Sequence, residues 1–243
     1  GISYTLSDQD EDLTGYELTD YEAVIVVTGV YDAVSTMIPD ASLTKLIDYA
    51  TVSHGPIYVE GADFAKDYSE GSATAQEFFG LFGTSFVNDG LDESDGNVEY
   101  LTANFSIFAR YLTWEYAYHT LADRFVDEIA PVGTRAQVLW TDEEGVARGV
   151  LNRTGRYTAI FSSCYTGGIV EGTAPLTRLR YLAQILEEMG IPTTGIADNI
   201  KKVPTSIALE QNYPNPFNAF TAIELSLIHI SEPTRPLYIS YAV

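Results

Sequence analysis

Two side chains of this sequence could together perform nucleophilic catalysis. Cys164, the only cysteine, follows the apolar segment TAIFSS, and His54 stands before Gly55 in the segment ATVSHG. A thiolate is a strong nucleophile, and a nearby imidazole can remove the thiol proton, as the hydrolysis of a peptide bond requires. The simpler interpretation makes Cys164 a small buried apolar residue, His54 a loop residue and His119 a half-buried structural one.

A second candidate is a pair of carboxylates in the segment YVEGADF. Glu60 and Asp63 come at the end of a short apolar run, and the carboxyl ends of strands are where α/β folds bind ligands. No His or Arg lies near them in the sequence, so we expect at most a ligand-binding role.

Acidic segments offer a third kind of chemistry, because carboxylate oxygens are the ligands that Ca²⁺ prefers. The two segments contain Asp8, Asp10 and Asp12 (SDQDED) and Asp89, Asp92 and Asp95 (NDGLDESDG). Neither fits an EF-hand, since Leu13 stands where that loop needs Gly and Thr19 where it needs Glu. Solvated acidic loops are the simpler interpretation, and no cofactor other than calcium is suggested.

Composition limits the possible partners. The 243 residues carry a formal net charge of −21 with only 13 Lys and Arg, so binding to a phosphate backbone or to anionic lipid is not expected. No apolar run approaches the roughly 18 residues of a membrane span. The chain begins at Gly1 without Met or a signal peptide, and we expect it to be part of a longer protein.

Hydrophobic patterns predict the elements that would position these groups. The run at 23–27 is typical of a strand covered on both faces, Ser42 could cap a helix over 43–50, and 57–60 is a second strand. Further on, the patterns predict a helix within 74–83 and strands at 136–140, 147–152 and 157–162. The segment 98–118 is rich in aromatic and β-branched residues, which predicts one or more strands there. Pro175 could open a last helix that ends at Gly190, with Leu176, Leu179, Leu182, Ala183, Leu186 and Met189 on one stripe.

The segment LEQNYPNPFN closely resembles the start of the C-terminal sorting domain of type IX secretion cargo. The matching residues are Gln211, Asn212, Tyr213, Pro214, Asn215, Pro216, Phe217 and Asn218. Ala219 replaces the proline that usually follows, whereas Thr221 and Ile223 keep the opening of the next strand. The resemblance implies recognition by the type IX machinery and a location outside the cell or on the outer membrane after periplasmic transit.

The last residues of the sequence, 225–243, do not continue the resemblance to a sorting domain. Residues 225–235, LSLIHISEPTR, are similar to the translation of a sequencing-library transposon adapter. We therefore expect residues 225–243 to be a read-through artefact, in which His229 has no function.

The larger region resembles a module that precedes such sorting domains and is similar in outline to class I glutamine amidotransferases. The segments that carry this resemblance are YEAVIVVTGVY, YVEGADF, DRFVDEIAPVG and YTAIFSSCYTGGIVEGT. It implies an α/β fold, a three-layer flavodoxin-like sandwich with a mostly parallel sheet. Members with amidotransferase activity have a Cys after a strand and a His and Glu near the last strand, but here Glu60, Gly61 and Ala62 occupy the first position and the His-x-Glu pair is missing.

A cysteine peptidase of the gingipain or caspase kind is the competing resemblance, through His54-Gly55 and Cys164. Those enzymes place His-Gly after a strand, whereas His54 precedes one, and the separation of about 110 residues is long for that family.

The sequence therefore predicts a non-catalytic accessory or interaction module of a larger secreted or surface protein, whose other domains are partners and whose sorting segment directs export. The expected organisation is an acidic remnant at 1–20, the α/β module at 21–191, a linker at 192–206, the sorting segment at 207–224 and the tail at 225–243. The alternatives are the cysteine peptidase and a calcium-binding surface module.

Overall fold

The computed structural model describes residues 5, 13–29, 38–90, 98–104, 111–117 and 126–193, and the backbone of two short strands at 208–209 and 225–226. The chain divides into two compact units, residues 1–196 and 197–243, and this division falls within the segment predicted as a linker. No helix in the described ranges combines the length and the apolar character that crossing a membrane requires.

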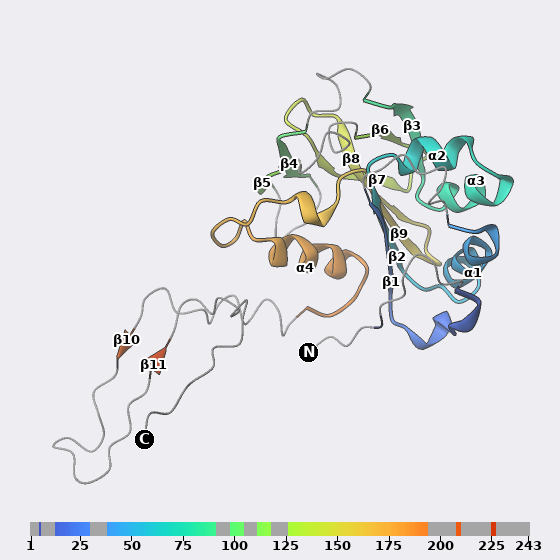
Figure 1. Cartoon of the computed structure of the whole chain (residues 1–243), viewed down its shortest axis with the longest axis horizontal. Helices are drawn as coiled ribbons and strands as arrows, with labels where there is room; N and C mark the ends of the chain where they lie inside the picture. The colour runs from blue at the N-terminus through green and yellow to red at the C-terminus, as the bar shows by residue number, and fades with distance from the viewer. Residues whose placement is uncertain are drawn as a thin grey trace, which may run out of the picture. The chain divides into compact units, whose positions relative to one another are not determined.

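The first unit is built on a seven-stranded mixed sheet with the order β1-β2-β9-β8-β7-β4-β5 (Figure 1). The strands are β1 (Val24–Gly29), β2 (Ile57–Gly61), β4 (Tyr100–Ala103), β5 (Thr113–Glu115), β7 (Ala136–Thr141), β8 (Ala147–Arg153) and β9 (Thr158–Ser162). Strands β1, β2 and β9 are parallel to one another, and the pairings from β9 to β5 are antiparallel. The α/β class is confirmed, but the predicted mostly parallel order holds only for three strands. Strands β7, β8 and β9 are consecutive in the sequence and are joined by short turns at Gly145 and Gly155. Turns this short connect antiparallel strands as hairpins, whereas a parallel connection needs a longer crossover.

Successive side chains of the inner strands point to opposite faces of the sheet and pack into two separate hydrophobic cores. In β2, Ile57 and Val59 enter one hydrophobic cluster, whereas Tyr58 enters the other. In β9, Phe161 likewise belongs to the first cluster and Ile160 to the second. Because successive side chains of a strand point to opposite faces, the sheet is covered on both sides and the unit has three layers.

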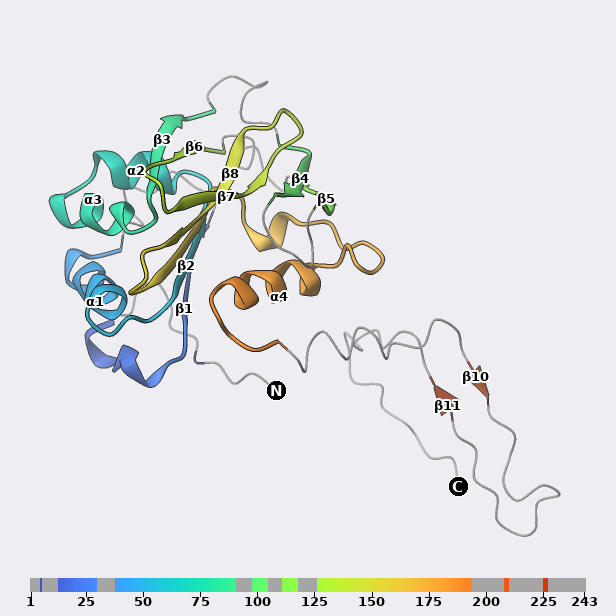
Figure 2. The same cartoon turned by 180° about the vertical axis from the view of Figure 1, so that it is seen from behind.

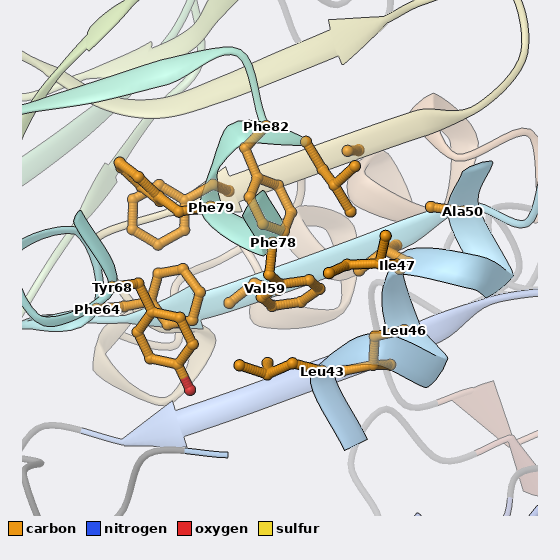
Figure 3. Packing of buried hydrophobic residues seen from close by; sticks show 14 of the residues in the cluster. Leu43, Leu46, Ile47, Ala50, Val59, Phe64, Tyr68, Phe78, Phe79 and Phe82 are labelled. Atoms are coloured by element: carbon orange, nitrogen blue, oxygen red, sulfur yellow. The ribbon is translucent and has the colours of Figure 1, made fainter. Parts of the chain in front are cut away.

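Three helices cover the first face: α1 (Asp40–Thr51), α2 (Phe64–Glu70) and α3 (Ala73–Gly80). Both views place them on the side of the sheet opposite α4 (Arg178–Glu188) (Figures 1 and 2). Their apolar positions pack with the sheet as an aromatic cluster in which Phe64 stacks on Tyr68 with ring centroids 3.9 Å apart (Figure 3). Ser72 begins α3 by accepting a hydrogen bond from the backbone N–H of Ala75 at 3.1 Å, as helix-capping serines do.

Helix α4 covers the second face, and its boundaries differ from the prediction. Thr177, rather than Pro175, is the N-cap, because its hydroxyl accepts a hydrogen bond from the N–H of Arg180 at 3.1 Å. Gly190, with φ of 83°, follows the helix as predicted. Leu179 of the predicted apolar stripe is 46% exposed, while Tyr181 packs against Trp114 and Trp140.

Two other expectations are corrected at the amino-terminal part of the unit. Strand β1 is at the edge of the sheet, and Ile25 and Val27 are 45% and 62% exposed, so the run is not covered on both faces. Ser42 lies inside α1, where its buried hydroxyl accepts a hydrogen bond from the N–H of Leu13 at 3.2 Å. Within the predicted acidic remnant at 1–20, the two 3-10 turns Leu13–Gly15 and Leu18–Asp20 pack on α1.

A small antiparallel sheet of β3 (Thr84–Asn88) and β6 (Glu128–Pro131) completes the first unit. In the second unit, β10 (Ala208–Leu209) pairs with β11 (Leu225–Ser226) in antiparallel register. The eight residues of the predicted sorting motif, 211–218, lie outside the described residues, as do most of the residues predicted to be an artefactual tail.

Candidate functional site

Glu60 lies at the carboxyl end of β2 and is held in a buried hydrogen-bond network. Its Oε2 accepts hydrogen bonds from the Tyr58 hydroxyl at 2.6 Å, the Thr166 hydroxyl at 2.8 Å and the Thr166 N–H at 3.0 Å. Burial raises the pKa of the Glu60 carboxyl, although the three donors act in the opposite direction. Three donors converge on one oxygen, so Glu60 ties β2 to the loop after β9.

Cys164 lies two residues after the end of β9 and is completely buried in the second core. Its backbone N–H donates to the Ser162 hydroxyl at 3.2 Å, and the same hydroxyl donates to the Cys164 carbonyl. Burial raises the pKa of the Cys164 thiol to about 12, with only partial relief from the nearby Arg148. A thiol in this setting stays protonated at neutral pH and behaves as an apolar core residue.

His54 lies at the amino-terminal end of the parallel strands, whereas Cys164 lies at their carboxyl end. His54 precedes β2 in a turn with φ of 62° and lines a surface pocket with Pro56, Arg156 and Tyr157. Strands β2 and β9 are parallel and pair Ile57 with Ala159 and Glu60 with Ser162. The length of these strands alone separates their amino-terminal ends from their carboxyl ends by about 10 Å. The structure therefore does not bring the His54 imidazole to the Cys164 thiol.

Three carboxylates meet where β2, β3 and β6 end or begin. Asp63 follows β2, Asp89 follows β3 and Asp127 precedes β6. One oxygen from each side chain lies within 4.8 Å of the other two. The antiparallel pairing of Asn88 with Glu128 brings Asp89 and Asp127 together, and the N–H of Asp127 donates to the Ala62 carbonyl at 3.0 Å, which fixes it beside Asp63. We call Asp63, Asp89 and Asp127 the acidic triad.

Lys66 of α2 is a basic residue in contact with the acidic triad. Its Nζ forms an ion pair with Asp89, and its backbone N–H donates to Asp127 Oδ2 at 3.0 Å. Asp127 is completely buried, and burial, with a smaller contribution from Asp63 and Asp89, raises the pKa of its carboxyl to about 8. The hydrogen bond to Asp89 raises the pKa of the Lys66 ammonium, and the attraction of the nearby carboxylates, that of Asp89 first, acts in the same direction. The acidic triad thus holds more negative charge than Lys66 neutralises.

A buried ion pair supports the same region. Arg148 of β8 donates through Nε to Asp142 Oδ2 at 2.9 Å and through Nη1 to the Val126 carbonyl at 2.8 Å. The side chains of Arg148 and Asp142 are only 1% and 4% exposed. Because Val126 precedes Asp127, the pair fixes the backbone that presents a member of the acidic triad.

The sequence-predicted residues are only partly brought together. Asp63 and Asp89 were expected in different sites and belong to one, whereas Glu60 belongs to the network with Tyr58. Asp92, Asp95 and His119 lie outside the described residues, as do Asp8, Asp10 and Asp12. Asp127 was not among the predicted site residues, and the only signal for it in the sequence is its place in the segment DRFVDEIAP.

Comparisons with known proteins give little further information. No protein-family model and no curated protein matches the chain. Among solved structures, it is similar to the exo-β-1,4-mannosidase Op5Man5 from Opitutaceae bacterium strain TAV5, with 15% sequence identity and a TM-score of 0.39. The matched region covers 79% of this chain but 26% of that protein, so the chain corresponds to about a quarter of the mannosidase's length.

Proposed function

We propose that residues 21–191 form a non-catalytic accessory or interaction module of a larger secreted or surface-attached protein. The observation that carries this proposal is the position of the single thiol. Cys164 lies in the core with a raised pKa, and His54, its candidate base, lies at the opposite end of the parallel strands. A nucleophile and its base must come within hydrogen-bonding distance, so this pair favours a structural over a peptidase role.

The turn after β2 supports the same proposal. The amidotransferase resemblance puts the nucleophile at this strand-turn-helix position, and the chain has Glu60, Gly61 and Ala62 there. Ala62 is buried, and a Cβ on Gly61 would come within 1.8 Å of the Thr28 hydroxyl. The turn between β2 and α2 thus joins a strand to a helix without a nucleophilic side chain at these positions, which supports the proposal of an amidotransferase-like, flavodoxin-like scaffold that is not catalytic.

The QNYPNPFN segment supports export through the type IX machinery. Each of its prolines fixes φ and favours an extended backbone, which is suited to the entry of a β-structure. On this proposal the partners of the module are the other domains of the complete protein, and the secretion machinery recognises the segment at 207–224.

Export is testable in the complete natural protein, expressed in a bacterium that has the type IX machinery. Replacing Tyr213, Pro214, Pro216 and Phe217 together by Ala should shift the protein from the cell surface and medium to the periplasm, by at least about tenfold in their ratio. The expected cause is loss of the extended, aromatic recognition element. Immunoblots of the fractions measure the ratio, and replacement of Lys201 and Lys202 in the linker is the control. Equal export of the two variants would contradict the proposal.

A further inference from the structure

We propose that the acidic triad, Asp63, Asp89 and Asp127, binds a divalent cation of the size of Ca²⁺. This inference concerns a site beyond the accessory role proposed above and is independent of how the protein is exported.

The geometry of the three oxygens matches a coordination sphere. All lie within 4.8 Å of one another. Two ligands on opposite sides of Ca²⁺, with bonds of 2.3–2.6 Å, are about 5 Å apart, so three oxygens within 4.8 Å of one another can share one such ion. The three carboxylates can therefore serve as ligands of one Ca²⁺ ion, and water can supply the remaining ligands.

An unpaired oxygen points to a missing ligand. Asp127 is completely buried, and its Oδ1 has no hydrogen-bond partner, while Oδ2 accepts from the N–H of Lys66. A buried carboxylate oxygen without a partner is costly, because it has lost water and gained nothing in exchange. A cation bound between Asp127, Asp63 and Asp89 would compensate the burial of the Asp127 carboxyl group and remove the repulsion among the three groups.

Lys66 is the group with which a cation would compete. Its ammonium pairs with Asp89, but its side chain is 39% exposed and can turn to solvent without being buried elsewhere. Asp63 is also partly exposed, so an ion has a route to the triad from this side. Lys66 thus serves as a replaceable counter-charge, and its removal should strengthen the binding of a cation.

The test uses the intact chain, freed of metal with a chelator and then titrated with CaCl₂ in calorimetric binding and thermal unfolding measurements. We expect Tm to rise by about 5 °C at 10 mM Ca²⁺, as for an ion that binds with a Kd near 10⁻⁴ M. Asp127→Asn should abolish the rise. Lys66→Gln should lower the Kd about tenfold, because a positive charge beside the ion is removed.

Controls separate this site from the general acidity of the chain. Asp48→Asn changes the same charge on the exposed face of α1 and should keep the full rise in Tm. Asp63→Asn is the second variant if Asp127→Asn does not fold, since the Asp63 side chain makes no capping hydrogen bond to α2 that the substitution would remove. The proposal is overturned if Ca²⁺ leaves Tm unchanged, if Asp127→Asn and Asp63→Asn respond as Asp48→Asn does, if Lys66→Gln binds no more tightly, or if Mg²⁺ acts equally well.

Discussion

Replacing Asp142 by Asn is expected to lower the free energy of unfolding by about 3–5 kcal/mol. The substitution keeps an oxygen that can accept from the N–H groups of Glu144 and Val146, at 3.0 Å and 2.8 Å, so the turn is preserved. What is lost is the negative charge of the Asp142 carboxylate, which pairs with the buried guanidinium of Arg148. Urea unfolding followed by circular dichroism measures the change, which corresponds to a fall in Tm of about 10 °C.

Two further variants isolate the cause. In the double variant Asp142→Asn, Arg148→Met neither charge remains, and most of the lost stability should return, since apolar replacements of buried pairs are often neutral. Arg153→Met breaks a pair with Glu188 in which the Arg side chain is 43% exposed, and it should cost no more than about 1 kcal/mol. If the Asp142→Asn variant were as stable as Arg153→Met, the buried pair of Asp142 and Arg148 would not contribute the predicted ~3–5 kcal/mol to the free energy of unfolding.

Replacing Phe161 by Ala is expected to cost about 3–5 kcal/mol. Phe161 is completely buried on the central strand β9, and its ring centroid lies 5.1 Å from that of Phe64 and 6.0 Å from those of Phe79 and Phe82. The truncation opens a cavity between the sheet and the helices α2 and α3, which rigid aromatic neighbours cannot fill. Urea unfolding measures the loss of stability, and the slope of the free energy of unfolding against urea concentration should stay the same as in the unsubstituted chain.

The matched control is Phe161→Leu, which keeps most of the volume and should cost less than about 2 kcal/mol. If the Ala variant lost no more stability than the Leu variant, the helices of this layer would not be packed against β9 as described.

Local pattern was sufficient to predict most of the elements of the first unit. The strands at 57–60, 136–140, 147–152 and 157–162 were expected within one residue or so of β2, β7, β8 and β9, because alternation and glycine turns are encoded in neighbouring residues. The direction of each strand was not predictable in the same way. It depends on which strand becomes a neighbour, and the antiparallel half of the sheet is set by long-range pairing such as that of β4 with β7.

The candidate site shows the same limit more sharply. Asp63 and Asp89 were recognisable as acidic loop residues, but only the pairing of β3 with β6 places Asp127 beside them, across 38 positions from Asp89 to Asp127. Likewise, Arg148 gives no sign in the sequence of being buried, because its partner Asp142 is in an exposed-looking acidic turn, TDEEG. Thr177 could be distinguished from Pro175 as the helix cap only by its hydrogen bond to Arg180.

The reactivity of Cys164 toward iodoacetamide at pH 8 most directly tests whether this module is a scaffold without a nucleophile. A thiol that is completely buried, with its pKa raised to about 12, reacts only when the protein opens. We therefore predict that the native chain is alkylated at least about a thousandfold more slowly than the chain in urea, and equally slowly in a His54→Ala variant. Rapid alkylation of the native chain that is lost in His54→Ala would contradict the proposed function and establish the thiol–imidazole pair.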